Sequence, residues 1–120
     1  MTGTEKTILL VVDDESAVCR ALRRMLRGKF DEIIAAETPA DAEAVLASRA
    51  VTHVVCDHCL GPGQPEGLTI ASAWRSAHPT IRKMIILTGV NLRSLAPAPG
   101  VDLLLPKTID PADLAARLVD

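Results

Sequence analysis

The sequence predicts an α/β domain in which a five-stranded parallel sheet is covered by helices on both faces, a doubly wound (βα)5 arrangement. Three observations predict it. Short apolar runs of strand length alternate with segments of helical period along all 120 residues. The runs are apolar at successive positions, as in strands buried on both faces. With 48% apolar residues and no linker or low-complexity stretch, one domain is expected over residues 1–120.

The first strand and helix are expected over residues 7–12 and 16–27. Asp13 and Asp14 end the apolar run of the strand, and Gly28 suits the end of the helix. The helix has one apolar face that can pack on the sheet. Four arginines lie mostly off that face and are interpreted as a solvated surface: Arg20, Arg23, Arg24 and Arg27.

Two further strand–helix units follow. A short strand over residues 32–36 precedes a helix that Thr38 caps and Pro39 starts, since these residue types favour those positions. A third strand over residues 52–56 precedes a helix from about 67 to 77. That third helix is expected to end at His78 and to pack Trp74 at its junction with the sheet.

The last part of the chain predicts two strands, over residues 83–87 and 101–105. Between residues 91 and 99 there is room for only a stub of helix, because prolines interrupt it, so the fourth helix is expected to be shortened. Asp110 and Pro111 then cap and start a final helix.

Composition excludes several classes of protein. The formal net charge is -2 and the only aromatic residues are Phe30 and Trp74, so direct binding of nucleic acid is not expected. No apolar run is long enough to cross a bilayer, and the first residues lack the features of a secretory signal. Three cysteines are too few for a disulfide scaffold. We therefore expect a cytoplasmic protein without membrane insertion.

Polar residues follow four of the predicted strands. In a parallel doubly wound sheet the carboxyl ends of all strands lie along one edge, where ligands bind. The residues expected to meet there are Asp13 and Asp14 after the first strand, Asp57 after the third, Thr88 after the fourth and Lys107 after the fifth. Each of these residue types is common in the loop after a strand, so one alone is weak evidence. Five such residues at the carboxyl ends of four strands indicate a functional site.

Three neighbouring carboxylates repel one another, and a hard divalent cation such as Mg²⁺ would relieve that repulsion. Beside a metal, Asp57 can act as a nucleophile towards phosphorus. Lys107 can neutralise charge on phosphoryl oxygens, and Thr88 can donate a hydrogen bond to one of them.

Five stretches carry a family resemblance that covers essentially all 120 residues: ILLVVDDE at 8–15, VVCDHCLGPG at 54–63, GL at 67–68, MIILTG at 84–89 and GVDLLLPK at 100–107. They resemble the receiver domain of two-component response regulators. The resemblance implies a flavodoxin-like, CheY-like fold and a place in phosphorelay signal transduction. It also implies phosphorylation by a histidine kinase or histidine phosphotransfer protein and an output partner that the sequence does not identify.

Position by position, the resemblance implies a role for each residue of the edge: Asp57 as the phospho-acceptor, Asp14 as a direct Mg²⁺ ligand, Asp13 acting on the metal largely through water, the backbone carbonyl of Cys59 as a further ligand, Thr88 as the switch hydroxyl and Lys107 as the phosphate-binding ammonium. Such domains are not conventional enzymes, but they catalyse their own phosphorylation and dephosphorylation. They change a face formed by the fourth helix, fifth strand and fifth helix, through which two copies can also pair as a homodimer.

The chain departs from the family pattern at positions linked to switching. Thr108 follows Lys107 where the family usually has proline, so a trans bond is expected there. Leu104 stands where an aromatic residue usually reports switching. The interval from Thr88 to Lys107 is shorter than usual, and the loop after the acceptor is longer. The residues of the acceptor chemistry are all present.

Cys59 and Val90 flank the expected path of a hydrolytic water. Neither side chain positions water well, so the phosphorylated form is expected to be comparatively long-lived.

A second interpretation of the same stretch uses its sulfurs, because Cys56 and Cys59 have the spacing of a redox or zinc pair. Cys56 lies in a strand and should point away from Asp57 into the core, whereas Cys59 should be exposed. A zinc site needs four ligands, and no second cysteine pair exists. His58 is expected to face solvent in the loop.

Two other functions stay open at this point. A degenerate receiver could act as a protein-interaction module without phosphorylation. An aspartyl-phosphate phosphatase of the haloacid dehalogenase type also uses aspartate, threonine and lysine, but it places a second aspartate two residues after the nucleophile, where this chain has Cys59. No output segment follows Val119, as expected of a stand-alone receiver or of a piece of a longer chain.

Overall fold

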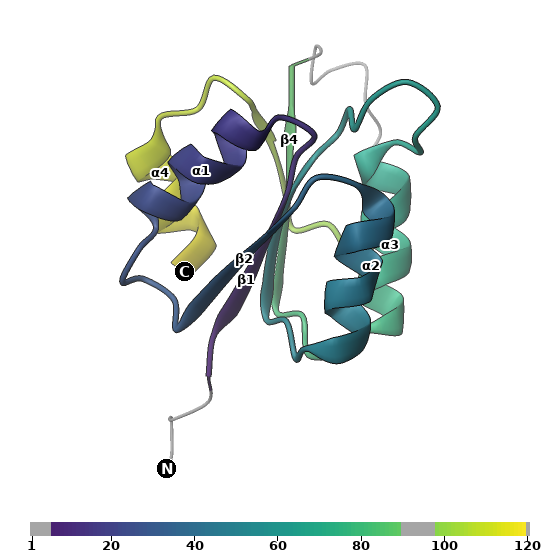
Figure 1. Ribbon diagram of the computed structural model, residues 1–120, viewed down its shortest axis with the longest axis horizontal. Coiled ribbons are helices and arrows are strands. Elements are labelled where there is room, and N and C mark those ends of the chain that lie inside the picture. The colour runs from purple at the N-terminus through teal and green to yellow at the C-terminus, as the bar shows by residue number, and fades with distance from the viewer. Residues whose placement is uncertain (1–5, 90–97, 120) are drawn as a thin grey trace.

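The computed structural model describes residues 6–89 and 98–119. Within these residues the chain alternates between strands and helices (Figure 1). The elements are β1 Ile8–Val12, α1 Ser16–Met25, β2 Glu32–Ala36, α2 Pro39–Ser48, β3 His53–Asp57, α3 Gly67–Ala77, β4 Lys83–Thr88, β5 Leu103–Pro106 and α4 Pro111–Val119. The predicted α/β class is confirmed.

All five strands form one parallel sheet in the order β2-β1-β3-β4-β5. Helices α1 and α4 cover one face, and α2 and α3 cover the other (Figure 1). The strand order reverses direction between β1 and β3, which makes the crevice beyond their carboxyl ends the expected binding place in a sheet of this type. The doubly wound arrangement is therefore as predicted.

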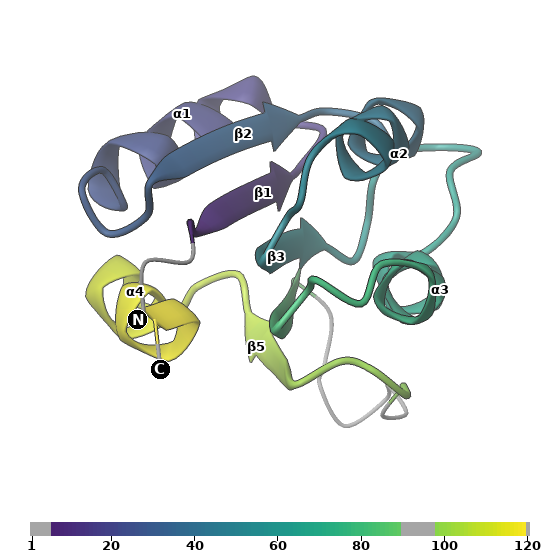
Figure 2. The same cartoon turned by 90° about the horizontal axis from the view of Figure 1, so that it is seen from below.

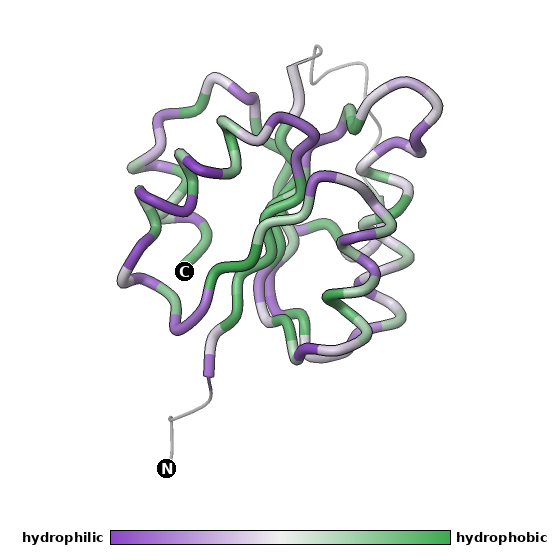
Figure 3. The backbone as a smooth tube through the Cα atoms, viewed as in Figure 1, coloured by the Kyte–Doolittle hydropathy of each residue, from purple (hydrophilic) through white to green (hydrophobic). Residues whose placement is uncertain are grey.

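The sheet separates two hydrophobic cores, and the central strands contribute to both. In β1, Leu10 packs towards α2 and α3, whereas Leu9 and Val11 pack towards α1 and α4. The middle of the sheet is hydrophobic in Figure 3, as expected of central strands that are buried on both faces. Cys56 lies in the α2–α3 core with no exposed surface, so it is the core thiol that its strand position predicted.

Local signals placed most element ends correctly. The Thr38 hydroxyl accepts a hydrogen bond of 3.1 Å from the Asp41 amide, so Thr38 caps α2 as predicted. His78 caps the carboxyl end of α3, and the buried Trp74 donates from its indole nitrogen to Glu43 on α2 at 3.3 Å. No described peptide bond is cis, so the bond after Lys107 is trans.

Some boundaries differ from the prediction. Helix α1 ends at Met25, two residues before the expected end, and β5 begins at Leu103. Asp57 and Thr88 are the last residues of their strands and do not follow them. The expected stub of helix falls largely on residues 90–97, which lie outside the described residues. Over the part of the chain that is described, no helix is both long and apolar enough to cross a membrane.

The start of α3 lies directly against the end of β3. A Cβ atom added to Gly67 would stand 2.4 Å from the Asp57 carbonyl oxygen and 2.9 Å from the His58 Cα, and the Gly67 amide donates to the His58 carbonyl at 2.8 Å. This approach corrects one prediction. His58 does not face solvent but is only 3% exposed, and its Nε2 lies 3.4 Å from the carboxylate of Glu66, the residue before α3.

Replacing Gly67 with alanine is expected to push α3 away from β3 and lower the free energy of unfolding by about 1 to 3 kcal/mol, the usual cost of an added methyl group in a packed place. Urea denaturation of the variant and the parent measures the difference. Gly89→Ala is the matched control, since its Cβ would meet no described atom within 4 Å. Equal destabilisation of the two variants would contradict the close approach.

Candidate functional site

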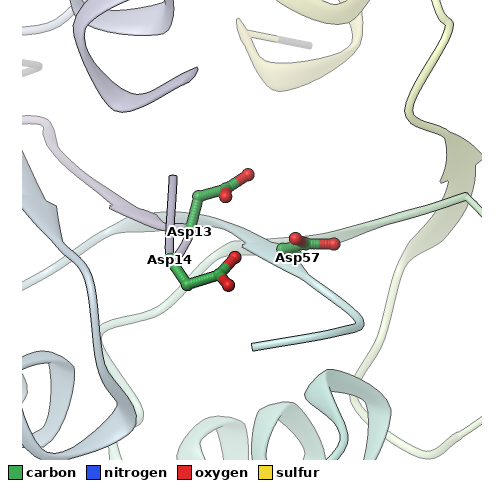
Figure 4. A group of neighbouring side chains, drawn as sticks. All are labelled: Asp13, Asp14 and Asp57. Carbon is green, nitrogen blue, oxygen red and sulfur yellow. The ribbon is translucent and has the colours of Figure 1, made fainter. Parts of the chain in front are cut away.

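Three aspartates meet at the carboxyl edge of the sheet (Figure 4). Asp13 and Asp14 directly follow β1, and Asp57 ends β3. These strands are neighbours with Val12 paired to Cys56, so Asp13 and Asp57 lie at the same level of the sheet. One carboxylate oxygen from each of the three residues lies within 4.8 Å of the others. The parallel register thus brings together groups that are far apart in the chain.

Asp13 is held by its main chain and its side chain. Its amide donates to the Ala36 carbonyl at 3.1 Å, and its Oδ1 accepts from the Glu15 amide at 2.9 Å. The residue is only 2% exposed. Burial raises the pKa of Asp13 to about 6, and the charges of Asp57 and Asp14 act in the same direction, whereas the Glu15 amide and Lys107 oppose them. Its ionised form is therefore costly.

Asp57 is buried, and each of its carboxylate oxygens accepts a hydrogen bond. Oδ1 accepts from the Cys59 amide at 3.3 Å, and Oδ2 accepts from the Lys107 ammonium at 2.9 Å. The carboxylate is thereby fixed between the loop after β3 and the residue after β5.

Lys107 lies among three carboxylates. Its ammonium is 2.9 Å from Asp57, 3.4 Å from Glu15 and 3.5 Å from Asp13. Its amide donates to the Thr88 carbonyl at 2.8 Å, which fixes the start of the segment after β5. Burial opposes the charged ammonium, but the hydrogen bond to Asp57 and the charges of Asp13 and Asp57 outweigh burial and hold the pKa of Lys107 above its usual value.

Thr88 occupies the end of β4, between Asp57 and Lys107 in the order of the strands. Asp57 is paired with Leu87 and Thr88 with Pro106, so the threonine lies one position further along the same edge. It is 1% exposed. The five residues expected at this edge are thus all found at the carboxyl ends of β1, β3, β4 and β5.

The cysteines do not form a joint site. Cys59 is exposed, whereas Cys56 is buried and its thiol donates to the Asp57 carbonyl at 3.3 Å. Burial raises the pKa of Cys56 well above its ordinary value, which disfavours the reactive thiolate. Among the described residues the aspartates are the one group able to hold a metal ion, so the structure offers no set of zinc ligands.

Glu15 was not assigned to the site from the sequence. It lies at the N-cap position of α1 and is one of the three carboxylates around Lys107, although its side chain is 64% exposed. Its place directly after Asp13 and Asp14 was the available signal, but the contact depends on how far the side chain reaches. The edge therefore carries an excess of negative charge that a cation can balance.

The donor set fits a hard divalent cation. Carboxylate and carbonyl oxygens are the ligands that Mg²⁺ and Ca²⁺ prefer, and three carboxylates already lie within the reach of one ion. Burial raises the pKa of Asp13 although the charge of Lys107 opposes this effect, so a cation beside Asp13 would favour its ionised form.

No family model matches the sequence. Similar curated proteins exist nonetheless. The chain is 34% identical to the acid tolerance regulatory protein ActR of Sinorhizobium medicae and 32% identical to the photosynthetic apparatus regulatory protein RegA of Rhodobacter capsulatus. These alignments cover 99% and 98% of this chain but only 61% and 63% of the relatives, so the chain spans less than two thirds of their length.

Solved structures show the same fold. The signal receiver domain of an HD domain-containing protein from Pseudomonas fluorescens Pf-5 matches with a TM-score of 0.85 and 26% identity, over 98% of this chain and 88% of that one. A response regulator from Burkholderia pseudomallei matches with a TM-score of 0.81 and 22% identity, over 93% of this chain and 66% of that one. With its sheet order, the chain has the fold of CheY-like receiver domains, and its sequence is similar to those of response regulators.

Proposed function

We propose that the chain is a single phospho-accepting receiver domain that takes a phosphoryl group onto Asp57 from a histidine kinase or histidine phosphotransfer protein in the cytoplasm. The observation that carries this proposal is the position of the Asp57 carboxylate. One of its oxygens is 2.9 Å from the Lys107 ammonium, and the carboxylates of Asp13 and Asp14 lie beside it.

The reaction is a transfer between two nucleophiles. One oxygen of Asp57 forms a bond to phosphorus while the bond from phosphorus to the donor's imidazole nitrogen breaks, and that nitrogen keeps the electron pair. Asp57 suits this role because hydrogen bonds from Cys59 and Lys107 fix its orientation before the donor arrives. Lys107 would then contact a phosphoryl oxygen, and Thr88 would donate its hydroxyl to another.

Mg²⁺ fits the acidic side of this site. Asp14 and Asp57 would hold it directly, the carbonyl of Cys59 would supply a further oxygen, and Asp13 would act largely through water. The bound ion would neutralise charge on the phosphoryl oxygens. The Burkholderia pseudomallei response regulator contains a phosphorylated aspartic acid and a calcium ion in its crystal structure, which supports a divalent cation for this fold.

A receiver of this kind catalyses its own phosphorylation and dephosphorylation and passes the signal to a partner protein. The switching positions differ from the family pattern, since Leu104 is a partly buried core residue of β5 and Thr108 follows Lys107. We propose that the phosphorylated state is read by an output partner without the usual aromatic switch. A phosphorylation-independent interaction module is the second candidate, favoured only by these two positions.

Incubation with acetyl phosphate and Mg²⁺ is expected to add the mass of one phosphoryl group to the parent protein, because Asp57 is held as a nucleophile beside Lys107. Intact-protein mass spectrometry measures this addition. Asp57→Asn keeps the size of the side chain and should show no addition, and chelation of the metal should abolish the addition to the parent. Equal labelling of the variant would remove Asp57 as the acceptor.

Asp13→Asn is expected to stabilise the metal-free protein at pH 7. The pKa of Asp13 in the folded protein, about 6, exceeds the ordinary 3.8, so ionisation between these values lowers the stability of the fold. Above about pH 6 the full cost is present, on the order of 1 to 3 kcal/mol, and asparagine removes it while keeping an oxygen for the Glu15 amide.

Urea denaturation at pH 7 and pH 4 tests this, since the advantage of the variant should shrink as pH falls. Added Mg²⁺ should stabilise the parent and have much less effect on Asp13→Asn. Asp113→Asn, an exposed change on α4 with the same loss of charge, should keep the metal response. A metal response in Asp13→Asn as large as in the parent would contradict the site.

Replacing Cys59 and Val90 with polar residues is expected to shorten the lifetime of the phosphorylated protein, because a polar side chain beside Asp57 can orient an attacking water. Cys59 is exposed next to the acceptor, and Val90 lies outside the described residues. Phosphate release after removal of acetyl phosphate measures the lifetime. An unchanged rate of decay in the double variant would show that these positions do not set it.

A further inference from the structure

Helix α1 and the turn after it carry four exposed arginines on one side, which we call the arginine stripe: Arg20, Arg23, Arg24 and Arg27. Spacings of three and four place Arg20, Arg23 and Arg24 on one side of α1, and Arg27 follows in the turn after the helix. Arg20 therefore has like charges at both neighbouring positions of its own face, which destabilises the helix. A helix surface that only contacts solvent is more stable when arginines alternate with acidic residues. The arginine stripe contains no acidic residue.

No carboxylate among the described residues forms an ion pair with the stripe, and the guanidinium of Arg20 donates only to the Ser16 hydroxyl at 3.4 Å. The nearest acidic residues are already engaged. Asp31 accepts from the amide and hydroxyl of Thr7, and Glu32 pairs with Arg49 and Lys6. The positive charge of the stripe is thus not balanced by the described part of the chain.

A cavity of about 480 Å³ separates the stripe from the start of β2. All four arginines line one side of it, and Phe30, Asp31, Glu32 and Ile33 line the other. Guanidinium groups present paired N–H donors that match a carboxylate, and the rings and branches of Phe30 and Ile33 supply apolar contact. The cavity can therefore take a ligand that is acidic and partly apolar.

Strand β2 lies at an edge of the sheet, beside α1 (Figure 2). The Glu32 amide donates towards β1, to the Thr7 carbonyl, and the Ala36 carbonyl accepts from the Asp13 amide. Main-chain groups alternate in direction along a parallel strand, so those of Ile33 and Ala35 point outwards. Within the described residues β2 pairs with β1 alone, and its outer side is open for strand addition.

The dimensions of the two features agree. Alternate side chains of an added strand are about 6.6 Å apart, so three of them cover about 13 Å. Four helical steps from Arg20 to Arg24 cover about 6 Å, which matches the spacing of two alternate side chains of the strand. Acidic side chains at alternate positions of that strand would face the stripe. We infer that the β2 edge and the arginine stripe bind an extended acidic segment of a partner protein by strand addition.

Synthetic peptides test this proposal. The probe is a fluorescent eight-residue peptide that alternates glutamate and threonine, and its control alternates glutamine and threonine. Fluorescence anisotropy should show binding of the acidic peptide that weakens in 0.5 M salt, and at most weak binding of the control. Arg20→Gln with Arg24→Gln should weaken binding by roughly tenfold, as expected for the loss of two exposed ion pairs. Arg117→Gln, an exposed arginine on α4, should change it less than twofold.

Amide exchange measured by NMR tests the strand addition itself, and the acidic peptide should slow exchange at Ile33 and Ala35. Labelling by acetyl phosphate should be the same in the arginine variants and the parent, which shows that they are folded. Three results of these binding experiments would overturn the proposal. These are equal affinity for both peptides, binding without protection of Ile33 and Ala35, and tighter binding of a twenty-base-pair DNA duplex. Self-association that the double arginine variant abolishes would instead assign the edge to a second copy of the chain and would also overturn it.

Discussion

The ion pair between Lys107 and Asp57 organises the carboxyl edge of the sheet. At 2.9 Å the ammonium holds the Asp57 carboxylate, and at longer distances it also faces Asp13 and Glu15. Burial of Asp13 raises its pKa to about 6, although the charge of Lys107 and the hydrogen bond from the Glu15 amide oppose this effect. Ionisation of Asp13 is therefore unfavourable at this edge, and a bound cation would offset that cost.

The backbone that supports this ion pair is fixed from three sides. The pairing of β1 with β3 places Asp13 level with Asp57. The hydrogen bond from the Lys107 amide to the Thr88 carbonyl fixes the position of the lysine backbone relative to the end of β4. From the third side, Gly67 lets α3 approach the Asp57 carbonyl so closely that no side chain fits between them. Asp57 thus lies at a point where packing resists small shifts of any of these elements.

Much of this arrangement could be predicted from the sequence, because topology does most of the placing. Once the apolar runs are taken as parallel strands, the residues at their ends must share one edge, whatever their distance in the chain. The contact of Glu15 with Lys107 could not be predicted, since it depends on the reach of an exposed side chain. The burial of His58 could not be predicted either, because it follows from the tertiary approach of α3 at Gly67 and not from local composition.

Helix α1 connects the acidic edge to the arginine stripe. Its cap, Glu15, donates its amide to Asp13 and extends its carboxylate to Lys107, while Arg20 and Arg24 project from the following turns beside β2. A phosphoryl group that draws Lys107 away from Glu15 would remove one restraint on the start of this helix. The start of α1 thus belongs to the acidic edge, and its later turns carry the arginine stripe.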